Sequence, residues 1–107
     1  MNVSFNSDWL RDVSCNITTA TEEYGPHVAQ ALVTLIADAE AAENASEWHE
    51  ILGTDVIISK DCFEIEFGSA YNARFVDAVQ SKQLNEDGSV KWLHVSRLKL
   101  MSIMRRS

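Results

Sequence analysis

The hydrophobic period of the sequence changes near Gly53, and this change limits the chain to folds that contain both helices and a sheet. From Leu10 to Leu52 apolar residues recur every three or four positions, which is the spacing of amphipathic helices. After Gly53 they recur every second position, which is the spacing of strands with one buried face. The chain has 107 residues, 46% of them hydrophobic. This is enough for one core, so we expect a single α+β domain over 1–107.

The first half predicts a short strand followed by a hairpin of two helices. Asn2–Phe5 is the expected strand, and Ser7 is placed to cap the first helix. The apolar face of that helix consists of Leu10, Val13, Ile17, Ala20 and Tyr24. Gly25-Pro26 ends this helix and begins the next, because proline is favoured at a first helical position. The apolar stripe of the second helix is Val28, Leu32, Leu35, Ile36 and Ala39. The stretch Ala45–Leu52 continues it or begins another turn.

The second half predicts an antiparallel meander. The expected strands are Asp55–Ser59, Cys62–Phe67, Tyr71–Ala78 and Val90–Val95. Alternation directs Phe63, Ile65 and Phe67 toward the helices and Glu64 and Glu66 toward solvent. The remaining apolar residues, Leu98–Met104, predict a terminal helix or a tail. The fold expected is therefore a helical hairpin packed on a four- to five-stranded, mainly antiparallel sheet, with a possible C-terminal helix.

Charge is distributed unevenly along the chain. The net charge is −7, but residues 1–53 carry nine acids against Arg11 alone, and the last twenty residues carry five bases and no acid. One interpretation of this distribution is that the charged residues are solvated surface groups, with the cations placed near the end of a helix. A more specific interpretation is that the basic tail binds a polyanion or an acidic partner. An acidic surface that masks a basic partner is the matching hypothesis for the first half, with Asp38, Glu40, Glu43, Glu47 and Glu50 as the partner-binding residues.

Motifs for cofactors, metals and nucleophilic catalysis are missing from the sequence. It has no phosphate-binding loop, no Cys-x-x-Cys, no His-Glu-x-x-His and no Gly-x-Ser-x-Gly, so we expect no cofactor and no metal. Cys15 and Cys62 are interpreted as small core residues. The first ten residues contain neither a basic nor a long apolar run, so we expect a cytoplasmic protein that does not enter a membrane.

Two clusters remain as candidates for chemistry. His94 lies near Lys91, Arg97 and Lys99, where an imidazole can exchange protons while cations stabilise the charge of a phosphorane, as ribonuclease chemistry requires. The alternative is a simple surface histidine. Glu64 and Glu66 share one face of a strand and can hold a cation or act as acid and base. A solvated strand face is the plainer explanation of that pair.

The strand region resembles a family of bacterial toxins. The resemblance is carried by Leu52-Gly53, by Asp61-Cys62-Phe63-Glu64-Ile65-Glu66-Phe67 and by Tyr71-Asn72-Ala73-Arg74-Phe75-Val76. With the order strand, helices, strands, these segments resemble the RelE/ParE superfamily of toxin–antitoxin toxins, which includes HigB-like killer proteins. The resemblance implies a toxin that acts on messenger RNA during translation, or a divergent and inactive relative, with an antitoxin as its partner.

The resemblance also implies where an RNA site lies. The family's strand arginine, which contacts RNA phosphate, falls on Asn72, and Arg74 lies two positions on along the same strand face. The family's C-terminal basic or histidine-containing cluster corresponds in type to His94, Arg97 and Lys99. The implied catalytic residues are thus Arg74, His94 and Arg97, and the implied RNA-binding residues are Asn72, Lys91 and Lys99. The alternative function is a small acidic immunity protein or inhibitor. The sequence leaves open the substrate, the partner and the oligomeric state.

Overall fold

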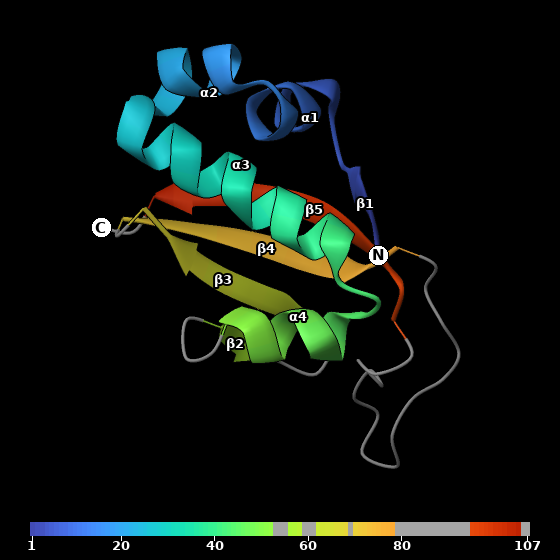
Figure 1. Cartoon of the computed structure of the whole chain (residues 1–107). Helices are drawn as coiled ribbons and strands as arrows, with labels where there is room; N and C mark the ends of the chain where they lie inside the picture. Colours follow the sequence, from blue (N-terminus) through green and yellow to red (C-terminus); the bar gives the residue numbers. More distant parts are fainter. Residues whose placement is uncertain (53–55, 59–61, 69, 79–94, 106–107) are drawn as a thin grey trace.

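The computed structural model describes residues 1–52, 56–58, 62–68, 70–78 and 95–105. These residues form β1 (Asn2–Phe5), α1 (Asp8–Cys15), α2 (Ile17–Tyr24), α3 (Pro26–Ala41), α4 (Ala45–Leu52), β2 (Val56–Ile58), β3 (Phe63–Phe67), β4 (Tyr71–Asp77) and β5 (Arg97–Arg105). Figure 1 shows α3 and α4 on one side of the sheet, with α1 and α2 above α3, toward the edge strand β1. The predicted α+β class is confirmed.

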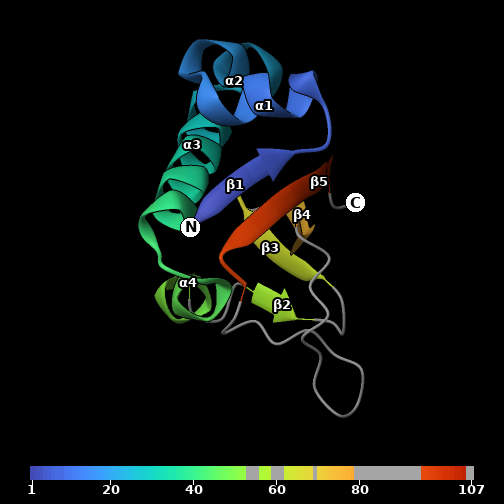
Figure 2. The same cartoon turned by 90° about the vertical axis from the view of Figure 1, so that its right-hand side faces the viewer.

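The sheet is mixed. Within the described residues its order is β1-β5-β4-β3-β2, and β1 pairs parallel with β5 while the other neighbours are antiparallel. The antiparallel order β2-β3-β4 confirms three strands of the predicted meander, and the fourth, Val90–Val95, lies almost entirely outside the described residues. The parallel pair was not predicted, because it joins the two ends of the described chain. Figure 2 shows β1 and β5 running side by side in the same direction.

The expected terminal helix is wrong, because residues 97–105 form β5. Leu98 and Leu100 alternate as in a strand, and both are fully buried. The register then shifts: Phe75 faces Leu100, but Arg74 faces Ser102. Met101 is therefore the extra residue of a bulge, which interrupts the two-residue period. The interruption leaves apolar residues at 98, 100, 101, 103 and 104, and three of these positions, 98, 101 and 104, have the spacing of a helix.

The helical half contains four helices in the described chain rather than a hairpin of two. The long first helix of the prediction divides at Asn16, whose side-chain Oδ1 accepts hydrogen bonds from the backbone N–H groups of Thr18 at 3.0 Å and Thr19 at 3.3 Å. This satisfies the free donors at the start of α2. The predicted Ser7 cap is confirmed, since its Oγ accepts from the Leu10 N–H at 3.2 Å. Pro26 begins α3, also as predicted.

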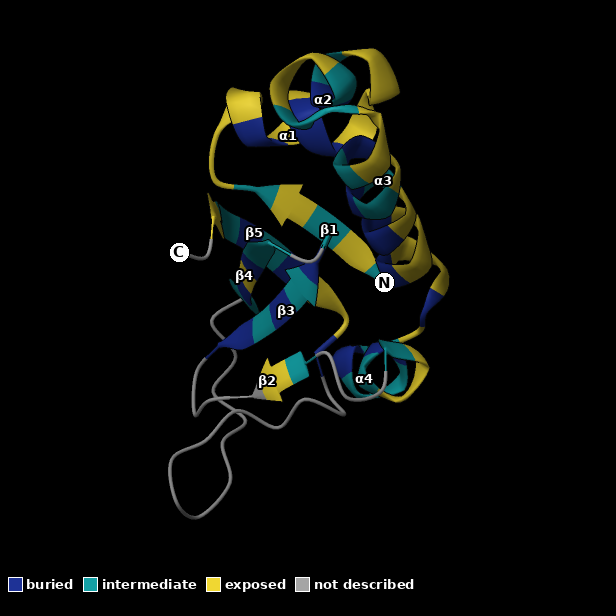
Figure 3. Ribbon diagram, turned by 90° about the vertical axis from the view of Figure 1, so that its left-hand side faces the viewer, coloured by how far each residue is buried: buried dark blue, intermediate teal, exposed yellow. Residues whose placement is uncertain are grey.

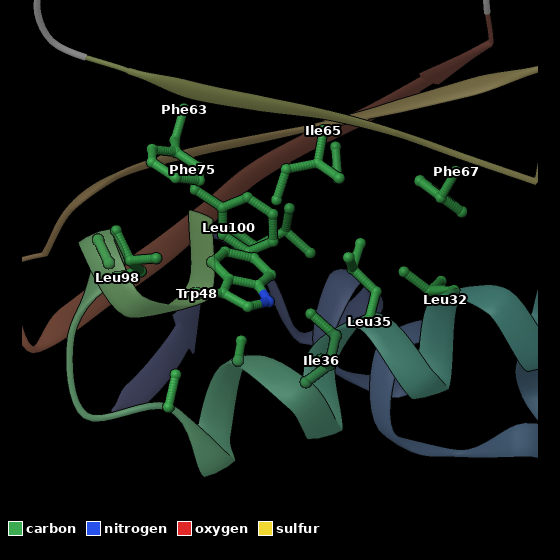
Figure 4. Close-up of a cluster of buried hydrophobic side chains, with 14 of the residues drawn as sticks. Leu32, Leu35, Ile36, Trp48, Phe63, Ile65, Phe67, Phe75, Leu98 and Leu100 are labelled. Atoms are coloured by element: carbon green, nitrogen blue, oxygen red, sulfur yellow. The ribbon is translucent and has the colours of Figure 1, made fainter. Parts of the chain in front are cut away.

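Trp48 lies at the centre of the core. Its ring stacks on Phe63 with centroids 5.8 Å apart and meets Phe75 edge-on at 5.0 Å. Figure 4 shows these rings between the sheet and α3, and Figure 3 shows the buried stripes of β3 and α3. The predicted inward direction of Phe63, Ile65 and Phe67 is confirmed. Of the two cysteines predicted to be core residues, Cys62 is buried and Cys15 is exposed, so the prediction for Cys15 is wrong.

Tyr24 and Tyr71 form an aromatic contact where α2 ends and β4 begins, with ring centroids 5.1 Å apart. Burial, then the charge of Glu23, then Tyr71 raise the pKa of Tyr24 from 10.0 to about 12. Since the folded state binds this proton more tightly, its stabilising contribution is complete below pH 10 and is lost as the pH rises through about 12. Titration followed by tyrosinate absorbance should show this late step, and Tyr24→Phe should remove it. If the late step persists in the Tyr24→Phe variant, it belongs to another tyrosine.

Candidate functional site

The side of the sheet opposite α3, which we call the open face, carries the polar residues of the strands. Because Phe63, Ile65, Ala73 and Phe75 point toward the helices, their neighbours in each strand point the other way. On the three central strands the open face consists of Glu64, Glu66, Asn72, Arg74, Val76, Arg97, Lys99, Ser102 and Met104. No described helix covers this face (Figure 1).

Three cations lie close together on the open face. Arg97 and Lys99 are two positions apart on β5, roughly 7 Å along the strand. Lys99 faces Val76 on β4, and Arg74 lies two positions from Val76 on the same strand. Arg74 and Arg97 are exposed and Lys99 is partly exposed. None of the three forms an ion pair with any residue that the structure describes. They therefore provide positive charge that an anionic ligand can approach.

The carboxylates of β3 lie beside this cationic group. In the β3–β4 register Glu64 faces Arg74 and Glu66 faces Asn72. Directly opposed side chains have Cβ atoms roughly 5 Å apart. Glu64 can thus accept a proton next to a cation that can stabilise negative charge. The Asn72 Oδ1 is buried and has no hydrogen-bond partner in the described part of the chain.

The structure brings together four of the six residues implied for an RNA site. Asn72, Arg74, Arg97 and Lys99 share the open face. The other two, His94 and Lys91, lie outside the described residues, as does most of the predicted strand Val90–Val95. Among the residues that are described, no three His, Cys, Asp or Glu side chains are placed to hold a metal ion. None of the described helices is long and apolar enough to cross a membrane.

The five acids predicted to bind a partner lie on the helical side of the molecule. Asp38 and Glu40 belong to α3, Glu43 follows it, and Glu47 and Glu50 belong to α4. All are exposed except Glu47, which is partly buried. None forms an ion pair with another described residue. Figure 3 shows the exposed outer surfaces of α3 and α4, so this acidic surface and the cations of the open face lie on opposite sides of the sheet.

Sequence reasoning missed a hollow between α1 and α3. It has a volume of about 170 Å³ and is lined by Ser14, Cys15, Val33, Ile36, Ala37 and Glu40. Ser14 is 1% exposed, and its hydroxyl has no hydrogen-bond partner among the described residues. The only signal in the sequence is a serine beside Val13 on the buried face of α1. The hollow itself depends on how two helices pack, which no local pattern encodes.

Comparison with protein-family models, with curated proteins and with solved structures finds no match to this chain.

Proposed function

We propose that this chain is a divergent RelE/ParE-like toxin that contacts RNA through the open face. The observation that carries the proposal is the gathering of Asn72, Arg74, Arg97 and Lys99 on one surface of the sheet that no described helix covers. The resemblance of the sequence to the RelE/ParE superfamily implies the same four residues for an RNA site. The element order, a strand, then helices, then strands, also supports the family assignment. Glu64 faces Arg74, and this position supports a role of the Glu64 carboxylate in proton transfer during cleavage.

Binding to RNA should depend on salt in proportion to the number of phosphate contacts. With three cations engaged on a single strand, we expect log Kobs to fall with log salt concentration at a slope of about −2. The triple variant Arg74→Ala, Arg97→Ala, Lys99→Ala should lose most of this slope and bind weakly at all salt concentrations. Fluorescence anisotropy with a labelled single-stranded oligoribonucleotide of mixed sequence measures both quantities.

Arg11 supplies the matched control for this measurement. It is an exposed arginine on α1, at the helical end of the molecule, and pairs only loosely with Asp8 at 3.8 Å. Arg11→Ala removes one positive charge without touching the open face, so affinity and slope should stay near those of the unmodified protein. An Arg11→Ala variant that loses as much affinity per charge as the triple variant would show that net charge, not the open face, governs binding.

Expression in a bacterial host tests the cellular part of the proposal. Induction should arrest growth with cleaved messenger RNA, and the triple variant should grow normally. If the protein binds RNA in vitro but messenger RNA stays intact in cells, the protein is an inactive relative of the toxins. Normal growth with no RNA binding would overturn the proposal.

A second candidate function, an acidic protein that masks a basic partner, is favoured by one observation. Asp38, Glu40, Glu43 and Glu50 are exposed and have no ion-pair partner in the described chain. Under this function the triple variant of the open face keeps its activity, whereas Glu43→Lys with Glu47→Lys abolishes it. Under the toxin function the triple variant loses its activity and the Glu43→Lys, Glu47→Lys variant keeps it. Measuring growth inhibition for both sets of variants therefore separates the two candidates.

A further inference from the structure

The three cations of the open face follow one another across two strands. Arg97 and Lys99 are two positions apart on β5, and Lys99 faces Val76 of β4. Arg74 lies two positions before Val76, and the antiparallel register places it opposite Ser102, beyond Lys99. The order along the sheet is therefore Arg97, Lys99, Arg74, and we call these three residues the cationic file.

The steps of the cationic file suit the repeat of an extended nucleic-acid strand. Two residues along a strand span roughly 7 Å, and the neighbouring strand lies roughly 5 Å away. The backbones of Arg97 and Lys99 are thus about 7 Å apart, and those of Lys99 and Arg74, which differ by one strand and two residues, are about 8 Å apart. Sites for single strands commonly follow the sugar-phosphate backbone with such a row of positive charges. Each cation can therefore contact its own phosphate when one RNA strand follows the file.

The cationic file ends at Arg74. On the next strand, β3, the residue opposite Arg74 is Glu64, which forms no ion pair with another described residue. Ile57 of β2 faces Glu64 and is 49% exposed. The described residues of β2 and β3 include no lysine or arginine. A phosphate placed beyond Arg74 on these strands would meet a carboxylate and an apolar side chain, so the favourable contacts stop at Arg74.

We propose that the cationic file binds a tract of four nucleotides of single-stranded RNA, with one of its three phosphates on each cation. The outer phosphates lie on Arg97 and Arg74, and the middle phosphate lies on Lys99. The inference rests on the proposed function and deepens it, because it gives the length of the RNA tract and the order of its contacts. All three contacts are made to phosphate, so they hold the tract whatever its base sequence.

A length series of oligouridylates without terminal phosphates tests the number of contacts. The series from dinucleotide to hexanucleotide adds one phosphate at a time, and amide shifts of the ¹⁵N-labelled protein report binding at two salt concentrations that differ tenfold. Each phosphate engaged adds up to about fivefold to the loss of affinity that the added salt causes. We expect this loss to grow up to the tetranucleotide and to stay constant for longer chains. A loss that still grows from tetranucleotide to hexanucleotide overturns the proposal.

Two variants that remove the same charge from β5 test the order of the contacts. Arg97→Gln removes one end of the file, so the two remaining cations are neighbours and the trinucleotide should already show the full affinity. Lys99→Gln removes the middle, so the remaining cations need the first and third phosphates of a tract. The trinucleotide should then bind about as weakly as the dinucleotide, and the tetranucleotide should bind more tightly than both. If the two variants share one length dependence, the cations act as an unordered cluster and the proposal is wrong.

The triple variant of the open face separates failure of this inference from failure of the proposed function. If neither the oligouridylates nor a longer RNA shows binding that the triple variant loses, the proposed function fails and the four-nucleotide tract fails with it. If the triple variant does lose RNA binding, but the length series shows no plateau at the tetranucleotide, only the four-nucleotide tract is overturned. A plateau at the tetranucleotide that moves to the trinucleotide in Arg97→Gln alone supports both.

Discussion

Replacing Trp48 by alanine is expected to lower the free energy of unfolding by about 3–5 kcal/mol. The indole is fully buried, stacks on Phe63 and meets Phe75 edge-on. It is also the main buried side chain that α4 contributes to the core. Its removal therefore leaves a large cavity and detaches α4 from the sheet. Urea unfolding followed by far-ultraviolet circular dichroism measures the loss independently of tryptophan fluorescence.

Two variants make this measurement specific. Trp9 is 48% exposed, so Trp9→Ala should cost less than about 1 kcal/mol. Trp48→Phe keeps part of the ring and removes an indole N–H that has no hydrogen-bond partner among the described residues, so it should cost much less than Trp48→Ala. If Trp48→Ala and Trp9→Ala lose similar stability, the packing of α4 on the sheet is not as described.

Replacing Gly68 by alanine is expected to cost about 2–3 kcal/mol, of which about 1–2 kcal/mol comes from the left-handed backbone. Gly68 has φ +59°, and a Cβ built there lies 3.1 Å from both methyl carbons of Val28. The remainder of the cost is therefore a collision between the β3–β4 turn and α3. Urea unfolding again provides the measurement.

A double-mutant cycle separates the two causes. In the Gly68→Ala background, Val28→Ala removes the collision, so it should cost less there than it does alone. Gly25 is the matched control: its φ of +86° is also unfavourable for alanine, but no atom lies within 4 Å of the added Cβ. Gly25→Ala should thus be destabilising and additive with Val28→Ala. Additivity at Gly68 as well would rule out the collision.

The sequence predicts those parts of the fold that short-range patterns determine. The alternation in Phe63–Phe67 gives the inward and outward faces of β3, and Gly25-Pro26 gives the boundary between α2 and α3. Both depend only on neighbouring residues, through the two-residue period of a strand and the fixed φ of proline. The division at Asn16 was missed, because the apolar residues keep a helical spacing across it.

Features that depend on distant residues could not be predicted in this way. The parallel pairing of β1 with β5 joins Asn2 to Arg97, and nothing within either strand specifies its partner. The bulge at Met101 depends on the register of β5 against β4. Because the bulge interrupts the alternation of apolar residues, the sequence pattern does not indicate that β5 is a strand. For the open face, strand periodicity was enough to place Asn72 and Arg74 on one surface. The approach of Arg97 and Lys99 to that surface required the position of β5.

The place of β5 between β1 and β4 has a consequence for synthesis on the ribosome. Chains emerge from the N-terminus, so β1 and the β2–β4 meander leave the ribosome before their common neighbour exists. Until residues 97–105 emerge, β1 and β4 each expose an unpaired edge, and the closing contacts between β1 and β5 span nearly the whole described chain. Contacts so distant in sequence form slowly. Arg97 and Lys99 join Arg74 only in this last step, so the complete cationic surface forms only once residues 97–105 have left the ribosome.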